Sequence, residues 1–277
     1  MQNAGIAALG LDWRYLAFEV WPEDLREAIA GARRMHFIGL NLTVPHKLLA
    51  VDMVDALDES ARKWGAVNTI RFEARGADGN WHPLQHFSDG IPREVRSHGF
   101  NTDADGITRS LREDLNFEAG GTRILLLGAG GAGRVAALKL AEDGPKVLHL
   151  VNRTMSKAES LAAEIRKRFA GVAVTVGYPS GDVDLILNAT SAGLKVDDDC
   201  PLDEAAFPLK RSRMVYDMIY RPAETPLLRK AKAAGCRTAN GLGMLLHQGA
   251  RALEIWSGKP APVNVMRAAL MKNIYGT

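Results

Sequence analysis

Three polar clusters in the first part of the chain lie at the ends of apolar strands. They are Asn41–Lys47 (NLTVPHK), Gly65–Thr69 (GAVNT) and Asn101–Gly106 (NTDADG). Ligands of open α/β sheets bind where strands end. A lysine and an aspartate that meet there can form a charge pair, and a partly shielded lysine can exchange a proton with a substrate hydroxyl during hydride transfer. Asparagine and threonine suit the hydroxyls of a polyol ring. Taken singly, Lys47 reads as a solvated lysine and Asp103 as a helix cap, so only the combination favours chemistry.

A second group of residues has the spacing of a dinucleotide-binding loop. Gly128, Ala129, Gly130, Gly131, Ala132 and Gly133 match the pattern G-x-G-x-x-G. An apolar strand is expected directly before this loop and a helix directly after it, which is the context that the pattern requires. Glycine permits the tight turn and the close approach of a pyrophosphate, and the helix N-terminus offers free N–H groups to the phosphates. A glycine-rich turn without a ligand is therefore disfavoured.

The end of the next expected strand, Lys146–Val151, distinguishes the two nicotinamide cofactors. An NAD site usually has an acidic residue there that binds the ribose hydroxyls. This chain instead has Asn152, Arg153 and Thr154, followed by Lys157. Arg153 can stack on the adenine and pair with a 2′-phosphate, while Thr154 and Lys157 add hydrogen-bond donors. We therefore expect NADP.

The elements that must position these residues alternate between strands and helices, which predicts an α/β fold with mainly parallel sheets. The expected strands are Trp13–Val20, Met35–Leu42, Ala66–Phe72, Arg123–Leu127, Lys146–Val151, Val172–Val176, Leu185–Asn188 and Met214–Asp217. The expected helices are Glu23–Ala30, Ser60–Trp64, Asp103–Leu115, Ala132–Asp143, Met155–Phe169, Met244–Trp256 and Val263–Tyr275. The polar stretch Ala74–Phe100 is expected to be a surface excursion. The part behind Glu118–Thr122 has the cadence of a doubly wound nucleotide-binding domain.

Composition excludes several classes of protein. The chain has 277 residues, of which 47% are hydrophobic and 24% charged, as in ordinary globular proteins. Its net charge of +3 does not favour nucleic acid or a membrane surface as partner. Cys200 and Cys236 are read as free thiols of a reducing compartment. The histidines at 82, 86 and 98 lack metal-site spacing, so no metal is expected. Without a membrane span or signal peptide, we expect a cytoplasmic protein.

Eight motifs in order resemble the shikimate dehydrogenase family, from near the first residue to near the last. They are LTVPHK (Leu42–Lys47), GAVNT (Gly65–Thr69), NTDADG (Asn101–Gly106), GAGGAG (Gly128–Gly133), NRT (Asn152–Thr154), NATSAG (Asn188–Gly193), YDMIYRPAETPLL (Tyr216–Leu228) and NGLGMLLHQGA (Asn240–Ala250). The resemblance implies an α/β substrate domain at residues 1–103 and a Rossmann-type NADP-binding domain at residues 104–242. It also implies that the C-terminal helices, residues 243–277, return to the first domain.

The same resemblance implies roles for individual residues. Lys47 and Asp103 correspond to the family's catalytic pair, and the substrate-binding residues are Thr43, Asn68, Tyr220 and Gln248. Thr190, Ser191, Gly241 and Met244 are expected beside the cofactor, together with the glycine-rich loop and the residues after the second strand. The implied reaction is the reversible reduction of 3-dehydroshikimate to shikimate by NADPH, a step of chorismate and aromatic amino acid biosynthesis. The protein is expected to act without a metal, as a monomer or homodimer.

The chain departs from the family at its start. The family's S-x-S-P segment, whose serines bind the substrate carboxylate, is absent, and the usual His-Asn pair reads Gln2-Asn3. We expect Met1 to be an internal methionine of a longer natural chain. Two alternatives stay open. In the first, the protein is a quinate or aminoshikimate dehydrogenase on the same scaffold. In the second, because both serines are missing, it is a dinucleotide-binding protein without catalysis.

Overall fold

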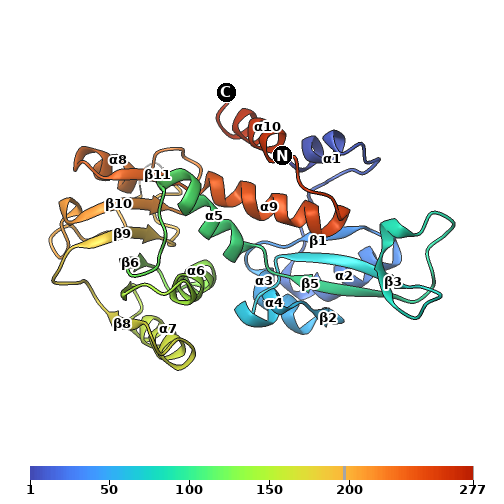
Figure 1. Ribbon diagram of the computed structural model, residues 1–277, viewed down its shortest axis with the longest axis horizontal. Coiled ribbons are helices and arrows are strands. Elements are labelled where there is room, and N and C mark those ends of the chain that lie inside the picture. The colour runs from blue at the N-terminus through green and yellow to red at the C-terminus, as the bar shows by residue number, and fades with distance from the viewer. Residues whose placement is uncertain (196–197, 277) are drawn as a thin grey trace. The chain divides into compact units, whose positions relative to one another are not determined.

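The computed structural model describes residues 1–195 and 198–276, which form two compact units (Figure 1). The first unit contains Met1–Asp103 and the chain from Gln248 onward, and the second contains Ala104–His247. One boundary lies at the first residue of α5 (Asp103–Leu115), and the other lies within α9 (Leu242–Ser257). The chain therefore leaves the first unit through one helix and returns to it through another.

The first unit has a mixed sheet that is mainly antiparallel. Its strands are β1 (Gly39–Asn41), β2 (Ala56–Leu57), β3 (Thr69–Arg75), β4 (Trp81–Pro83) and β5 (Val95–Phe100), in the order β1-β3-β5-β2 with β4 also paired to β3. The pairing of β2 with β5 is parallel, and the other three pairings are antiparallel. Alternate residues of β3, namely Ile70, Phe72 and Ala74, are fully buried in the core. The expectation of mainly parallel sheets is thus wrong for this unit.

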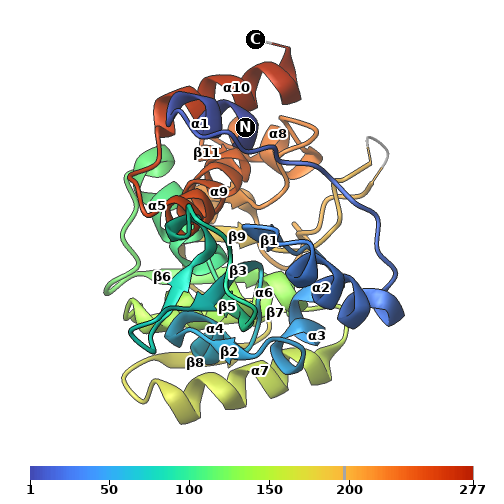
Figure 2. The same cartoon turned by 90° about the vertical axis from the view of Figure 1, so that its right-hand side faces the viewer.

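Short helices accompany this sheet. They are α2 (Leu25–Arg34), α3 (His46–Leu49) and α4 (Glu59–Trp64), with 3-10 turns at Pro22–Asp24, Ala50–Asp52 and Leu84–His86. Asp58 caps α4 by accepting a hydrogen bond from Ser60 N, and Gly65 ends it at φ 62°. Figures 1 and 2 show α1 (Gln2–Ala8) beside α10 (Val263–Tyr275), although the two helices come from opposite ends of the chain.

Two expected features of this unit are corrected by the structure. Trp13–Val20 is not a strand, because no described strand pairs with it; the backbone of Tyr15 is instead bonded to the side chain of Asn3. Ala74–Phe100 is not an irregular excursion, because it contains β4 and β5, and β5 pairs with β3 from Thr69↔Phe100 to Ala74↔Val95. In both cases the availability of a partner strand outweighed the local pattern.

Glu73 of β3 lies in a charged cluster of the first unit. Its carboxylate accepts hydrogen bonds from Arg71 Nε (3.0 Å) and Arg96 Nε (2.8 Å), and His98 Nδ1 lies 3.0 Å away. Burial by itself raises the pKa of Glu73, but the hydrogen bonds from His98, Arg71 and Arg96 outweigh burial and lower the pKa to about 2. Glu73 therefore stays ionised in the folded protein.

The second unit has a fully parallel sheet in the order β11-β10-β9-β6-β7-β8. The strands are β6 (Arg123–Leu127), β7 (Val147–Val151), β8 (Ala173–Val176), β9 (Val183–Asn188), β10 (Ser212–Asp217) and β11 (Arg237–Asn240). Consecutive residues such as Leu125, Leu126 and Leu127 are buried on both faces, as in doubly wound sheets. The predicted doubly wound fold is confirmed. The strand order reverses between β6 and β9, which is where such sheets bind ligands.

Helices precede, connect or follow these strands. They are α5, α6 (Gly131–Glu142), α7 (Met155–Arg168), α8 (Pro226–Ala233) and α9, with a 3-10 turn at Leu209–Arg211. α6 and α7 pack against each other (Figure 1). The sequence patterns predicted each of these α-helices except α8. They also missed β11, a short segment without an apolar run that pairs with β10.

Candidate active site

Lys47 and Asp103 form a charge pair in the first unit. Lys47 lies in α3, Asp103 is the first residue of α5, and Lys47 Nζ lies 2.8 Å from Asp103 Oδ2. The side chain of Asp103 is 9% exposed and that of Lys47 is 26% exposed. The carboxylate is therefore shielded while the ammonium stays accessible. This arrangement suits a lysine that exchanges a proton with a bound molecule.

Asn68 connects this pair to Gln248, a residue from the other end of the chain. Asn68 Nδ2 lies 2.9 Å from Asp103 Oδ1, 3.0 Å from Thr102 Oγ1 and 3.3 Å from Gln248 Oε1. An amide has only two N–H hydrogens, so three acceptors compete for them. The longest of these contacts, to Gln248, is the one that a ligand hydroxyl can replace at the lowest cost.

The register of the sheet explains why these residues meet. Thr69 of β3 is paired with Phe100 of β5, so Asn68, one residue before, faces the turn that begins after Phe100. The Asn68 side chain closes this turn, because its Oδ1 accepts a hydrogen bond from Thr102 N at 2.9 Å. Asp103 follows directly. Antiparallel pairing therefore brings two of the sequence motifs together.

Three further residues contribute to this polar cluster. Asn41, at the end of β1, donates to Thr69 Oγ1 at 3.0 Å and accepts from the hydroxyl of Tyr15 at 3.1 Å. The sequence could have identified Asn41 and Thr102, because they lie in the same polar clusters as Thr43 and Asp103. No sequence pattern pointed to Tyr15. Burial raises the pKa of the Tyr15 hydroxyl. Thr43 itself is exposed in the turn between β1 and α3.

The glycine-rich loop of the second unit leaves a helix N-terminus open. Gly128 has a φ of 104°, which other residues rarely adopt. A β-carbon at Gly133, in the first turn of α6, would collide with the carbonyl oxygen of Gly128, so this position requires glycine. Gly130, the N-cap of α6, has no side chain to satisfy the first N–H groups. These groups are therefore available to a bound anion.

Asn152 joins this loop to the segment that follows β7. Its Oδ1 accepts from Ala129 N at 2.9 Å, and its Nδ2 donates to Thr154 O at 2.8 Å. Arg153, Thr154 and Lys157 are exposed at the end of β7 and the start of α7. Two cationic side chains and one hydroxyl thus lie on the segment that Asn152 links to the glycine-rich loop.

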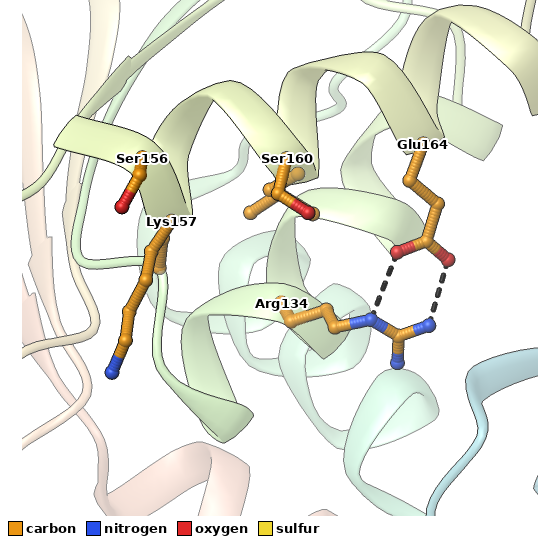
Figure 3. Close-up of a pocket in the computed structure, with 7 residues that line it drawn as sticks. Arg134, Ser156, Lys157, Ser160 and Glu164 are labelled. Atoms are coloured by element: carbon orange, nitrogen blue, oxygen red, sulfur yellow. Dashed lines mark hydrogen bonds and ion pairs between the residues drawn. The ribbon is translucent and has the colours of Figure 1, made fainter. Parts of the chain in front are cut away.

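A cavity of about 260 Å³ opens beside this segment. It is lined by Ala129, Arg134, Ser156, Lys157, Ser160, Leu161 and Glu164. Figure 3 shows the carboxylate of Glu164 facing the guanidinium of Arg134, and the two side chains make two hydrogen bonds of 2.9 and 2.7 Å. Glu164 also pairs with Arg168, so the acidic residue of the lining is neutralised. Of the residues that line this cavity, the sequence predicted Ala129 and Lys157 as cofactor-binding but not Arg134 or the two serines.

The remaining predicted residues follow other strands of the second unit. Thr190 lies against the glycine-rich loop, since a β-carbon at Gly128 would be 3.0 Å from Thr190 Cγ2. Ser191 next to it is exposed. Tyr220 is half-buried after β10. The turn that carries it is bonded to Gly241 through Ile219 O at 3.1 Å, and Met244 lies in the first turn of α9.

The described parts of the chain contain no group of three or more His, Cys, Asp or Glu side chains that could hold a metal. Cys200 and Cys236 are free cysteines. None of the helices in residues 1–195 and 198–276 is long and apolar enough to cross a membrane. The polar cluster of the first unit thus consists of an ammonium, a carboxylate, amides and hydroxyls, and the second unit carries the glycine-rich loop.

Family models match most of the chain. Residues 1–70 match the shikimate dehydrogenase substrate binding domain, residues 111–220 match shikimate/quinate 5-dehydrogenase, and residues 241–271 match the shikimate 5'-dehydrogenase C-terminal domain. The chain belongs to the shikimate dehydrogenase family. Lys47 lies in the part matched by the substrate binding domain, and the glycine-rich loop lies in the part matched by the shikimate/quinate model.

Individual proteins are similar to this chain over nearly its whole length. The shikimate dehydrogenase (NADP(+)) of Methanopyrus kandleri is 38% identical, over 99% of this chain and 90% of the relative. The shikimate 5-dehydrogenase of Thermus thermophilus, solved with NADP(H) and shikimate, is 32% identical with a TM-score of 0.77, over 98% of this chain and 92% of that one. A ligand-free 5-ketofructose reductase of a Gluconobacter species is 35% identical with a TM-score of 0.78, over 99% and 92%.

Proposed function

We propose that this protein reduces 3-dehydroshikimate to shikimate with NADPH and catalyses the reverse reaction with NADP⁺. The observation that carries the proposal is the 2.8 Å pair of Lys47 and Asp103, with Asn68 and Gln248 in contact around it. Shikimate dehydrogenases named for NADP(+) that share 38% of their residues with this chain support the choice of substrate and cofactor. The step belongs to chorismate and aromatic amino acid biosynthesis.

The first unit is proposed to bind the substrate. Asn68 is buried and Gln248 half-buried, and both present amides that can donate to ring hydroxyls and accept from them. Thr43, exposed beside α3, adds a hydroxyl. Tyr220, on the second unit, is proposed as a further substrate-binding residue. Amides held by neighbouring side chains lose little freedom on binding, which favours selection of a ring with correctly placed hydroxyls.

Lys47 is proposed to move the proton of the reaction. The hydride for the ring carbonyl would come from NADPH when it is bound. Lys47 donates its proton to the carbonyl oxygen as that oxygen gains negative charge, and in the reverse direction neutral Lys47 accepts the proton of the substrate hydroxyl. Asp103 holds the ammonium in position through the 2.8 Å contact, and Asn68 in turn orients the carboxylate.

The second unit is proposed to bind NADP, and its residues fit that cofactor. The open N-terminus of α6 suits the diphosphate, and Thr190, Ser191, Gly241 and Met244 are proposed to lie along the nicotinamide half. Arg153, Thr154 and Lys157 are proposed to bind the 2′-phosphate. The acidic residue that lines the adjoining cavity is paired with two arginines, so it does not repel a phosphate. Asn152 is proposed to hold both loops around the cofactor.

One assay tests the proposed reaction. Purified protein is given NADP⁺ with shikimate and then with quinate, and NADPH formation is followed at high pH. Turnover of shikimate supports the proposal. Turnover of quinate alone supports a quinate dehydrogenase, which the match to a shikimate/quinate model of residues 111–220 makes the second candidate. Binding of NADP⁺ without turnover of either substrate refutes both. NAD⁺ in place of NADP⁺ tests the cofactor.

A further inference from the structure

Asp217 and Asn188 are buried polar residues of the second unit that the proposed chemistry does not use. They end the adjacent parallel strands β10 and β9, where they are paired in register. Both are 0% exposed. Burial of a carboxylate is costly unless each of its oxygens is hydrogen-bonded. The contacts of Asp217 therefore indicate what this carboxylate does.

Three donors from three different segments converge on the Asp217 carboxylate. Its Oδ1 accepts from Asn188 Nδ2 at 2.9 Å and from Ile219 N at 3.0 Å, and its Oδ2 accepts from Thr225 Oγ1 at 2.7 Å. Burial raises the pKa of Asp217, and these three hydrogen bonds oppose that rise. Both oxygens act as acceptors, so an asparagine would lack the carboxylate's charge and could keep the contact to Thr225 only by reversing the direction of that hydrogen bond.

Asn188 transmits this constraint to the glycine-rich loop. Its Oδ1 accepts from Thr190 N at 3.0 Å and from Thr190 Oγ1 at 2.8 Å. Thr190 lies against Gly128, the first glycine of the loop, whose missing side chain leaves the space that Thr190 occupies. A continuous series of contacts thus runs from Asp217 through Asn188 and Thr190 to the loop.

The other two donors serve neighbouring segments. Ile219 precedes Tyr220, and the carbonyl oxygen of Ile219 accepts from Gly241 N at 3.1 Å. Thr225 is the N-cap of α8, where its hydroxyl also accepts from Leu228 N at 3.3 Å. One carboxylate therefore holds three segments at the carboxyl edge of the sheet, and two of them carry residues proposed to contact ligands.

We propose that Asp217 is a positioning residue for NADP(H): through Asn188 it holds Thr190 against the glycine-rich loop in the conformation that accepts the cofactor. The role rests on the proposed function for the identity of the cofactor. This role differs from a purely structural one in what it predicts. Cofactor affinity should fall whenever the Asn188–Thr190 contacts are lost, and it should not fall merely because the sheet is less stable.

The test measures the Kd for NADPH by fluorescence titration without substrate. Asp217→Asn is compared with Asp184→Asn, a carboxylate at the opposite end of β9 that accepts from Arg123 N at 2.9 Å. Asp217→Asn is expected to raise the Kd about tenfold or more, because the loss of a buried hydrogen-bond network has an effect of this order. Asp184→Asn is expected to leave the Kd unchanged, even where it lowers the melting temperature.

A double-mutant cycle identifies the route. Thr190→Ala raises the Kd by itself, and combining it with Asp217→Asn is expected to add little, because both remove the same constraint. Asn188→Ala, which leaves two donors on Asp217, must weaken NADPH binding in the same way. If Asp217→Asn does not fold, the Kd of Asn188→Ala tests the proposal in its place. An unchanged Kd in Asn188→Ala, or effects of Asp217→Asn and Thr190→Ala that multiply, overturns the proposal.

The outcome is independent of the proposed reaction, since binding is measured without substrate. Wild-type protein that binds NADPH but does not turn over shikimate refutes the reaction alone. A loss of that binding in Asp217→Asn, with Asp184→Asn unaffected, supports the positioning role in either case. An equal loss in both variants contradicts it and assigns Asp217 to stability only.

Discussion

Replacing Asp103 with asparagine tests the central pair of the proposed site. The change preserves the shape of the side chain but removes the negative charge 2.8 Å from Lys47 Nζ. Two unit charges about 4 Å apart interact by about 4 kcal/mol near a protein surface. Lys47 is 26% exposed, so solvent screening reduces the usable part to roughly 2 to 3 kcal/mol. If this energy orients the ammonium in the transition state, Asp103→Asn lowers kcat about 30- to 150-fold.

Lys47→Ala removes the proton donor itself and is expected to lower kcat by about 10²- to 10⁴-fold, the usual contribution of a general acid. The double variant is expected to be no slower than Lys47→Ala by more than about threefold, because the two residues act as one unit. The assay is steady-state oxidation of shikimate by NADP⁺, with the Kd for NADPH measured separately. Glu94→Gln, from an exposed 3.6 Å ion pair with Arg75, serves as the matched control and leaves kcat unchanged.

Two results would contradict this reasoning. If the effects of Lys47→Ala and Asp103→Asn multiply in the double variant, the residues act separately and the 2.8 Å contact is not functional. If Lys47→Ala loses NADPH binding together with turnover, Lys47 supports the fold and not the chemistry. Cofactor binding is expected to survive both changes, because the glycine-rich loop belongs to the other unit.

Three further predictions concern the cofactor loop and stability. Arg153→Asp is expected to lower kcat/KM for NADP⁺ at least tenfold relative to that for NAD⁺, because a carboxylate repels the 2′-phosphate. An unchanged ratio of kcat/KM for the two cofactors would show that Arg153 does not bind the 2′-phosphate. Gly133→Ala is expected to abolish NADPH binding in a fluorescence titration, because its β-carbon collides with the backbone of Gly128, while Gly144→Ala, strained but outside the loop, retains it. Since the pKa of Glu73 is lowered to about 2 from 4.5, its ionisation stabilises the fold above about pH 4.5, and this contribution is lost as the pH falls toward 2. Denaturant unfolding at pH 7 and pH 3 is therefore expected to show that the unfolding free energy of Glu73→Gln changes less with pH than that of wild type, by about 2 kcal/mol; parallel pH profiles would show that Glu73 contributes nothing.

Local sequence patterns were sufficient to predict most of the helices and strands of the second unit. The apolar run Arg123–Leu127, the glycines after it and the following helix are contiguous, and each element is determined by residues near it in sequence. Parallel strands buried on both faces also produce long apolar runs that are easily recognised. The segment Arg237–Asn240 became a strand without such a run, because β10 offers a hydrogen-bonding edge beside it. A partner strand also explains two wrong predictions in the first unit. Val95–Phe100 forms a strand because it pairs with β3, whereas Trp13–Val20 does not, because it pairs with no described strand.

The sequence by itself determined which residue types are present: an ammonium, a carboxylate, two amides and an open helix N-terminus. Only the tertiary structure decided that Lys47 and Asp103, separated by 56 positions, are in contact, and that Asn68 meets Gln248 across 180 positions. It also showed that the Asp217 carboxylate accepts hydrogen bonds from Asn188 at the end of β9, from Ile219 N and from Thr225 at the start of α8, contacts that the motifs containing these residues do not reveal. Periodicity reports how a residue relates to its neighbours in the chain, whereas strand register and burial determine which distant side chains share a hydrogen bond.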